Sequence, residues 1–153
     1  MKQTAVVVLL VLMACTAKKR HSGLIKEDIM GTWENISLTV KMNTYQNKDT
    51  TSYLRAPEGK WEEVLKIKPI RTTYNENGTY KSMYRDLEDR IVGESEGTWS
   101  IRNDSLILLA EGVEYSYSVI LENGNARFVS LMDWDQDGKS DDLYDGWQRK
   151  VEQ

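Results

Sequence analysis

The chain has 153 residues, 40% of them hydrophobic and 29% charged, which is enough for one domain with its own core and hardly for two. Its formal net charge of −4 argues against a nucleic-acid-binding protein, because such proteins carry a basic surface. A single His and a single Cys exclude most zinc sites, Cys–His nucleophile pairs and an internal disulfide.

The first residues have the pattern of a secretory signal. Lys2 provides a basic start, and the apolar run 5–12 that follows is shorter than the roughly 20 residues needed to span a bilayer. The run leads into Leu-Met-Ala-Cys at 12–15, which resembles the lipobox of bacterial lipoproteins. The resemblance implies that residues 1–14 are a signal peptide, that Cys15 carries acyl chains such as palmitate, and that 15–23 is a flexible tether. An ordinary signal peptide with a chance cysteine is the alternative.

The lipobox resemblance also implies a location. Lipoproteins sorted to the outer membrane carry a residue other than Asp after the acylated cysteine, and Thr16 stands there in this chain. No acidic run of the kind found in some surface-exported lipoproteins follows Cys15, which favours the periplasmic face. An acylated protein needs no transmembrane helix, since each buried methylene contributes about 0.8 kcal/mol to anchoring.

From Ile36 onward, hydrophobic and polar residues alternate with a period of two, which is typical of β-strands. Turn signals rich in Asn and Gly separate the alternating runs and suit tight hairpins. No long segment has a helical stripe, and at most one helical turn is expected, around 26–29. The predicted strands lie near 31–42, 63–74, 79–86, 91–102, 105–110, 112–121, 126–132 and 142–151.

Eight sequential antiparallel strands indicate either an up-and-down barrel or a sandwich. Closure removes exposed sheet edges and therefore favours the barrel. We predict an all-β fold, an eight-stranded up-and-down antiparallel barrel over 24–153. The longest irregular stretch, 43–60, is predicted to be a lid over a ligand. Its predicted ligand contacts are Tyr45, Tyr53 and Leu54.

Gly31-Thr32-Trp33 opens the first predicted strand, and the same Gly-Thr-Trp triplet occurs again at 97–99. Together with the long polar loop after the first strand, this pattern resembles the lipocalin-like (calycin-type) lipoproteins of Gram-negative envelopes, over about 24–151. The resemblance implies a barrel floor closed by Trp33 beneath a basic residue from the last strand, Arg149. Such a cation–π pair is worth about 0.5–2 kcal/mol.

One loop, 133–142, carries aspartates at alternate positions followed by a glycine. This spacing resembles the calcium loops of EF-hand, dockerin and thrombospondin-type repeats, in which alternate carboxylates converge on a hard cation. The predicted ligands are Asp133, Asp135, Asp137, Lys139 (through its carbonyl) and Asp141. Tyr144 replaces the usual glutamate at the twelfth position, and Asp142 or Asp145 are the candidate substitutes. We predict a weak structural Ca²⁺ site, with a Kd of about 10⁻⁴–10⁻³ M; an ion-free acidic turn is the alternative.

The sequence has no nucleophile elbow, phosphate-binding loop or histidine placed as a general base, so we do not expect an enzyme. The leading hypothesis is a membrane-tethered barrel that holds a small apolar or amphipathic molecule. The alternative is a structural or interaction module of the cell envelope, for example a protease inhibitor, with a filled core. The expected partners are a membrane through Cys15, a small apolar ligand and an envelope protein, but no nucleic acid.

Overall fold

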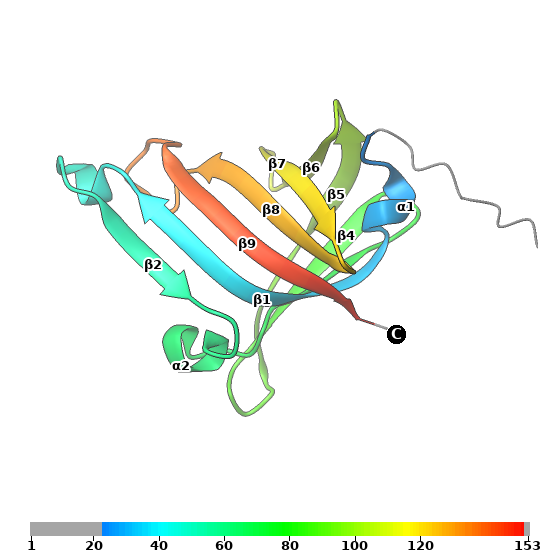
Figure 1. Cartoon of the computed structure of the whole chain (residues 1–153), viewed down its shortest axis with the longest axis horizontal. Coiled ribbons are helices and arrows are strands. Elements are labelled where there is room, and N and C mark those ends of the chain that lie inside the picture. Colours follow the sequence, from blue (N-terminus) through cyan, green and yellow to red (C-terminus); the bar gives the residue numbers. More distant parts are fainter. Residues whose placement is uncertain (1–22, 152–153) are drawn as a thin grey trace, which may run out of the picture.

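The computed structural model describes residues 23–151, over which nine antiparallel strands form one sheet (Figure 1). Eight of these strands follow one another around a closed barrel, because the last strand returns to pair with the first. The predicted all-β, eight-stranded antiparallel barrel is confirmed. The barrel strands are β1 (Gly31–Met42), β3 (Arg71–Tyr74), β4 (Thr79–Arg85), β5 (Ile91–Arg102), β6 (Ser105–Ala110), β7 (Val113–Glu122), β8 (Asn125–Met132) and β9 (Asp142–Val151).

A ninth strand and three short helices complete the described part of the chain. These elements are α1 (Lys26–Ile29), the 3-10 helix η1 (Tyr45–Asn47), β2 (Ser52–Ala56) and α2 (Trp61–Leu65). The helical turn expected around 26–29 is therefore confirmed. Within residues 23–151, no helix has the length and apolar character needed to cross a bilayer. The predicted signal peptide, Cys15 and all of the tether except Gly23 lie outside the described residues.

Strand β2 lies beside the barrel and extends its sheet at one end of β1 (Figure 1). The first four residues of β1 pair with β3, whereas its last five pair with β2. The prediction that 43–60 is irregular is therefore wrong for β2. Only Leu54 and Ala56 of this five-residue strand pack on apolar neighbours, and so short an alternation does not stand out among polar residues.

Helix α2 occupies the start of the segment 63–74, which was predicted to be one strand. Trp61 is buried and Leu65 packs in the same cluster, which is the i, i+4 spacing of one helical face. The helix ends at Lys66, whose φ of 59° is left-handed. The prediction of a single strand over 63–74 is therefore wrong, because only its last four residues, Arg71–Tyr74, form a strand.

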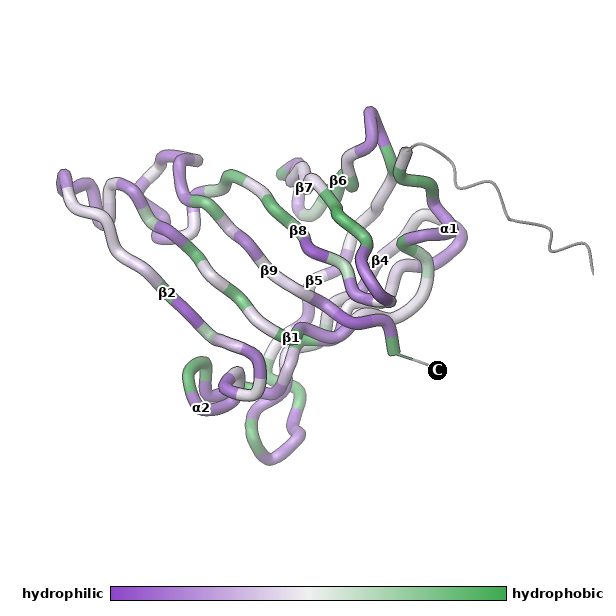
Figure 2. Tube along the Cα trace, in the orientation of Figure 1, coloured by the Kyte–Doolittle hydropathy of each residue, from purple (hydrophilic) through white to green (hydrophobic). Residues whose placement is uncertain are grey.

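Buried residues recur at alternate positions along β8 and β9. Figure 2 shows that hydrophobic and hydrophilic residues are intermixed along these strands, so hydropathy does not follow burial closely in β9. In β1 a β-bulge between Asn35 and Ser37 interrupts the alternation. Trp33 and Asn35 face the interior before the bulge, and Leu38 and Val40 do so after it. The bulge thus keeps the hydrophobic residues of the second half of β1 inside the barrel.

The interior contains two separate groups of buried hydrophobic residues. Helix α1 packs on the first group, and the indole Nε1 of Trp33 donates a hydrogen bond to the Ile29 carbonyl at 2.7 Å. The second group lies where β2 and α2 cover β1. The first group is Ile29, Trp33, Tyr74, Tyr80, Trp99, Leu106, Ala126 and Phe128. The second group is Leu38, Val40, Met42, Ala56 and Trp61.

The cation over Trp33 is Lys150, so the prediction that Arg149 has this place is wrong. Lys150 lies opposite Trp33 in the β1–β9 register, and its Nζ is 5.4 Å from the ring centroid. Arg149, one residue earlier, points to the other face of the sheet. There its guanidinium donates a hydrogen bond to Oε1 of Glu34 at 2.6 Å. Arg71 donates to the other carboxylate oxygen, Oε2, at 2.8 Å. Burial alone raises the pKa of Glu34, but hydrogen bonds from Arg149 and Arg71 outweigh it and hold that pKa below its usual value.

Three inward glycines each lie against an inward tyrosine. Tyr80 is directly opposite Gly97, and Tyr84 is directly opposite Gly93 in the β4–β5 pairing. On β9, a Cβ built on Gly146 would be 2.4 Å from the Tyr144 hydroxyl, so the ring lies along its own strand over the bare backbone. Cross-strand contact with an aromatic ring stabilises a glycine in a sheet.

The two glycines of β5 provide a matched test of this arrangement. A Cβ on Gly97 would be 2.0 Å from the Leu109 carbonyl oxygen, whereas a Cβ on Gly93 would have its nearest neighbour at 3.7 Å. Gly97→Ala is expected to lower the free energy of unfolding by about 1–3 kcal/mol, and Gly93→Ala by less than about 0.5 kcal/mol. Urea unfolding of both variants measures this difference, and equal losses would contradict the described packing of β5 on β6.

Candidate functional site

The interior of the barrel is partly open to solvent along β5 and β7. On β7, Tyr115, Tyr117 and Val119 face inward, and each is only partly buried, between fully exposed outward residues. Ser95 on β5 is likewise inward and partly exposed. In a filled barrel these inward rows would be buried by side chains from the opposite wall. Solvent therefore reaches this part of the interior.

Tyrosine rings from four strands converge in the same region. Tyr117 meets Tyr144 edge to face, with ring centroids 5.9 Å apart, and meets Phe128 in the same way at 6.4 Å. Edge-to-face contact is the preferred geometry of aromatic pairs. The inward tyrosines are Tyr74, Tyr80, Tyr84, Tyr115, Tyr117 and Tyr144. Together they give the interior an aromatic wall with hydroxyl groups.

Two buried amides lie beside this wall. Asn35 and Gln148 are 6% and 7% exposed and face each other in the β1–β9 register. Both side chains lie close enough to the Tyr144 hydroxyl to act on the pKa of that phenol, which they lower. The amide oxygen Oε1 of Gln148 is buried and has no hydrogen-bond partner in the described part of the chain.

The region between the two ends of the barrel is uncharged. Burial raises the pKa of Tyr144 to about 12, although the Asn35 and Gln148 hydrogen bonds act to lower it. Burial also raises the pKa of Tyr117 and Tyr84, so these phenols stay protonated near neutral pH. At the inward positions that the strand register identifies, the charged residues are Lys150 at one end and Asp142 at the other.

Burial of Tyr144 predicts a loss of stability at high pH. Its folded pKa of about 12 lies above the ordinary value of 10.0, so the stability it contributes is present below pH 10 and is lost as pH rises through 12. Urea unfolding of the wild type between pH 8 and 11 should show a falling free energy of unfolding, with up to about 1.4 kcal/mol per pH unit from this group. Tyr144→Phe should fall less steeply. Tyr53→Phe, on the outer surface, is the control. Equal slopes for wild type and Tyr144→Phe would contradict burial of this phenol.

The acidic loop between β8 and β9 brings together three carboxylates. One oxygen each of Asp133, Asp135 and Asp142 lies within 4.8 Å of the others. Asp142 is 1% exposed, and its Oδ2 accepts the backbone N–H of Trp134 at 2.8 Å and that of Asp135 at 3.2 Å. Asp142 is missing from the predicted ligands and was considered only as a substitute for the absent glutamate. Asp142 is the first residue of β9, and the spacing of aspartates within the loop does not show where that strand begins.

Two other predicted metal ligands, Asp137 and Asp141, are outside this cluster of carboxylates. Asp137 accepts hydrogen bonds from the Thr44 hydroxyl at 3.1 Å and from the Asn47 backbone at 3.2 Å, and Asp141 accepts from Thr44 at 3.2 Å. The Lys139 backbone N–H donates to Asp137 at 3.0 Å. These contacts fasten the acidic loop to the segment that contains η1. Asp145, the other substitute considered, is paired with Arg127.

One oxygen of the three clustered carboxylates lacks a hydrogen-bond partner among the described residues. Oδ2 of Asp133 accepts the Gly138 N–H at 3.0 Å, but its Oδ1 is buried without a hydrogen-bond partner among residues 23–151. Carboxylate oxygens are the ligands that Ca²⁺ prefers in proteins. The residues that could hold a divalent cation are therefore Asp133, Asp135 and Asp142.

The residues predicted to form a lid are divided between the second hydrophobic group, on which Tyr144 also packs, and the outer surface. Tyr45 and Leu54 pack on the second hydrophobic group, beside Val40 and Trp61. Tyr53 is 47% exposed on the outer side of β2, with the Arg55 guanidinium carbon 4.1 Å from its ring centroid. The segment is held to β1 by five paired residues.

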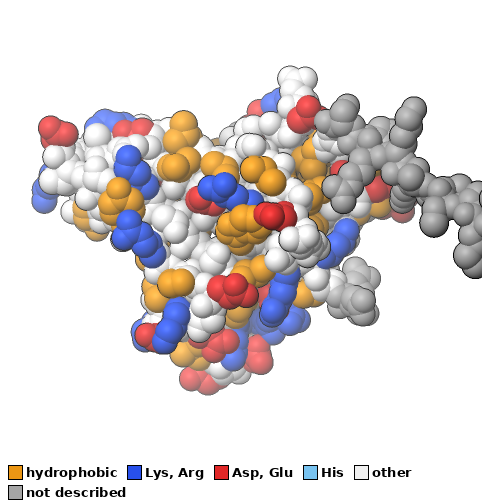
Figure 3. Space-filling view, viewed as in Figure 1, with side chains coloured by type: hydrophobic (Ala, Val, Ile, Leu, Met, Phe, Trp, Pro, Cys, Tyr) orange, Lys and Arg blue, Asp and Glu red, His pale blue; other side chains and the backbone are white. Residues whose placement is uncertain are grey.

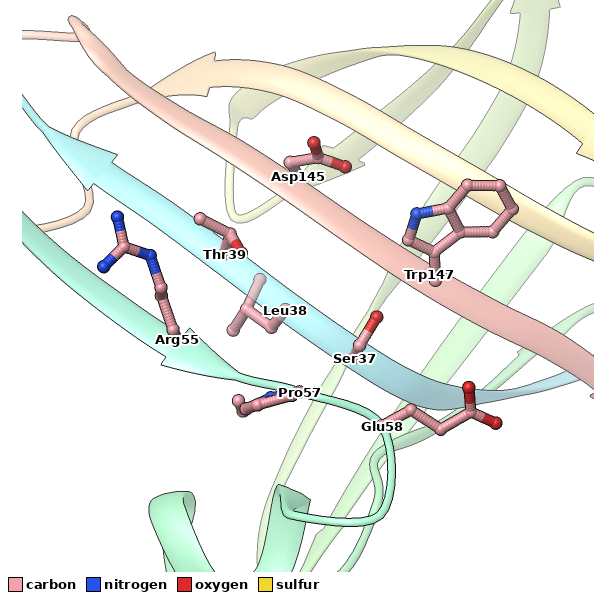
Figure 4. A pocket seen from close by; sticks show the side chains of 9 residues that line it. Ser37, Leu38, Thr39, Arg55, Pro57, Glu58, Asp145 and Trp147 are labelled. Atoms are coloured by element: carbon pink, nitrogen blue, oxygen red, sulfur yellow. The ribbon is translucent and has the colours of Figure 1, made fainter.

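A groove of about 340 Å³ lies on the outer face of the sheet where β2, β1 and β9 run side by side (Figure 4). Trp147 lies on β9 at one end of it, and Arg55 and Glu58 contribute charge from the other side. Its residues come from three distant segments, so no local motif indicates it. The lining residues are Ser37, Leu38, Thr39, Arg55, Ala56, Pro57, Glu58, Asp145 and Trp147. Elsewhere on the face seen in Figure 3, hydrophobic side chains lie in small groups among charged ones.

Comparison of the chain with models of known protein families and with curated protein sequences gave no match.

Proposed function

We propose that this chain is a lipocalin-like binding protein that holds a small apolar or amphipathic molecule inside its barrel. The observation that carries the proposal is the row of inward residues on β7, Tyr115, Tyr117 and Val119, which remain partly exposed within a closed barrel. An eight-stranded barrel is just wide enough to hold one small ligand when side chains do not fill it. Apolar walls with a few placed polar groups are typical of such sites.

The proposed protein is attached to a membrane by acyl chains on Cys15. The lipobox resemblance at 12–15 supports this attachment, and Thr16 supports the outer membrane, on its periplasmic face. The tether 15–23 would then hold the barrel close to the bilayer, where amphipathic molecules concentrate. No catalytic role is proposed, because the residues around the tyrosines include no nucleophile paired with a base.

The proposed ligand site predicts saturable binding of a neutral hydrophobic dye. N-phenyl-1-naphthylamine should bind one molecule per barrel with increased fluorescence. Ser95→Phe places a ring among the inward residues and should weaken binding at least about tenfold by occupying the ligand's space. Ser118→Phe, on the exposed outer face of β7, is the matched control and should change the affinity less than about twofold. Absence of saturable binding to the wild type would refute the proposed function.

We also propose that Asp133, Asp135 and Asp142 bind Ca²⁺ as a structural ion. The unpaired, buried Oδ1 of Asp133 supports this, as does the repulsion among three clustered carboxylates without a counterion. Since Asp142 begins β9 and the loop contacts the η1 segment, a bound ion would strengthen the join between two ends of the sheet.

Calcium should raise the melting temperature of the wild type at millimolar concentration. With a Kd of about 10⁻⁴–10⁻³ M, 10 mM Ca²⁺ would stabilise the fold by about 1–3 kcal/mol. Asp133→Asn should abolish the shift, because it removes one of the clustered charges. Asp137→Asn, whose side chain lies outside the cluster, should retain it. Calorimetry without binding heat, together with an unchanged melting temperature, would refute the site and favour an ion-free acidic turn.

The second candidate function is an interaction module of the cell envelope. It is favoured by the outer groove beside Trp147 and by the exposed Leu131 and Leu143, which lie directly opposite each other on β8 and β9. Exposed apolar residues next to a groove are common at protein–protein contacts. This function becomes the preferred one if the dye does not bind the barrel.

A further inference from the structure

The interior of the barrel contains a buried amide oxygen that accepts no hydrogen bond from the described residues. Gln148 is only 7% exposed, and its Oε1 has no hydrogen-bond partner among the described residues. The side chains of Gln148 and Asn35 both lie close enough to the Tyr144 hydroxyl to lower the pKa of that phenol. Buried polar atoms in proteins nearly always have a hydrogen-bond partner, so this oxygen is a candidate acceptor for a donor on a bound molecule.

The backbone of β9 leaves room for the Tyr144 ring beside this amide. Gly146 has no side chain, and a Cβ there would clash with the Tyr144 hydroxyl at 2.4 Å. The Tyr144 ring can therefore lie over Gly146, with its hydroxyl group reaching Gln148 two residues further on. Asn35 faces inward from β1, directly opposite Gln148, and it also lowers the pKa of the Tyr144 phenol. Gln148 therefore lies between two polar neighbours, Asn35 and the Tyr144 hydroxyl.

The surroundings of Oε1 select a neutral ligand. The inward charges are Lys150, over Trp33, and Asp142, bound to backbone N–H groups of the acidic loop. The tyrosines between them remain protonated because burial raises the pKa of Tyr117 and Tyr144. A charged ligand would lose its hydration without gaining an ion pair, which is strongly unfavourable.

The shape of the wall selects a ring. Tyr117 already packs edge to face on Tyr144 and Phe128, and the partly exposed Tyr115 and Tyr84 lie around it. Aromatic side chains arranged in this way offer ring edges and faces to a further aromatic group. The glycines opposite the β4 tyrosines keep that part of the wall free of bulky side chains.

We infer that the ligand is a neutral molecule with an aromatic ring that carries one O–H or N–H donor. The donor gives its hydrogen to Oε1 of Gln148, and the ring packs among Tyr84, Tyr115 and Tyr117. This inference rests on the proposed function, because it specifies the ligand class of the same interior site.

The test compares indole with N-methylindole, in which a methyl group replaces the hydrogen of the N–H donor; the Gln148→Leu variant separates loss of the donor from the added bulk. Binding to the full chain is followed by NMR titration of backbone amide resonances on β9. Indole should bind about tenfold more tightly than N-methylindole, as expected for one buried hydrogen bond. Gln148→Leu should remove this difference, whereas Gln136→Leu, in the exposed acidic loop, should preserve it. Indole-3-acetate and decanoate test charge and chain shape, and both should bind more weakly than indole.

Equal affinity for the two indoles in the wild type would overturn the inference, as would tighter binding of indole-3-acetate or decanoate. Binding of the naphthylamine dye without binding of indole would also overturn it, while the proposed function would stand. If neither the dye nor any probe binds, the proposed function itself fails. If Gln148→Leu does not fold, the wild-type comparison of the two indoles decides the result.

Discussion

The pairing of β1 with β9 is the constraint on which the barrel depends, because it joins the first barrel strand to the last. The ladder runs from Thr32 opposite Val151 to Lys41 opposite Leu143, with one bulge between Asn35 and Ser37. A one-residue shift in a strand moves every later side chain to the other face. Without the bulge, the polar positions between Leu38 and Met42 would face inward and the second hydrophobic group would face solvent. The same ladder brings the two interior amides together and places Lys150 over Trp33.

The interior that this ladder encloses changes character along its length. One end is closed by α1 and the apolar residues around Trp33, and the second hydrophobic group lies where β2 and α2 pack on β1. Between them lie tyrosine rings over bare glycine backbone, two amides and partly exposed inward positions. Close packing of side chains would give a more stable core than an open tyrosine wall with an unpaired amide oxygen. The looser packing of side chains in this region is the physical basis for the proposed binding function.

Period-two alternation predicts most of the barrel strands because each is long enough to show its pattern. The five-residue strand β2 and helix α2 were missed, since each depends on contacts with β1 more than on its own sequence. In β9 the hydrophobic pattern is misleading, because Trp147 lines an outer groove while Gln148 faces inward. The family resemblance indicates a basic residue near the end of this strand but not which one, and only the register identifies Lys150 instead of Arg149. The acidic loop is visible from local spacing, but its pairing with Asp142 is not. The tyrosine wall requires the register of four strands and could not be predicted from spacing alone.

The most direct measurement of the central claim is a high-resolution crystal structure of the chain purified without added ligand and grown with calcium. The account predicts electron density for a bound molecule or ordered water within hydrogen-bond distance of Gln148 Oε1, between that oxygen and the tyrosines of β4 and β7. A barrel whose interior is filled by its own side chains, with Gln148 Oε1 hydrogen-bonded to another protein group, would contradict it.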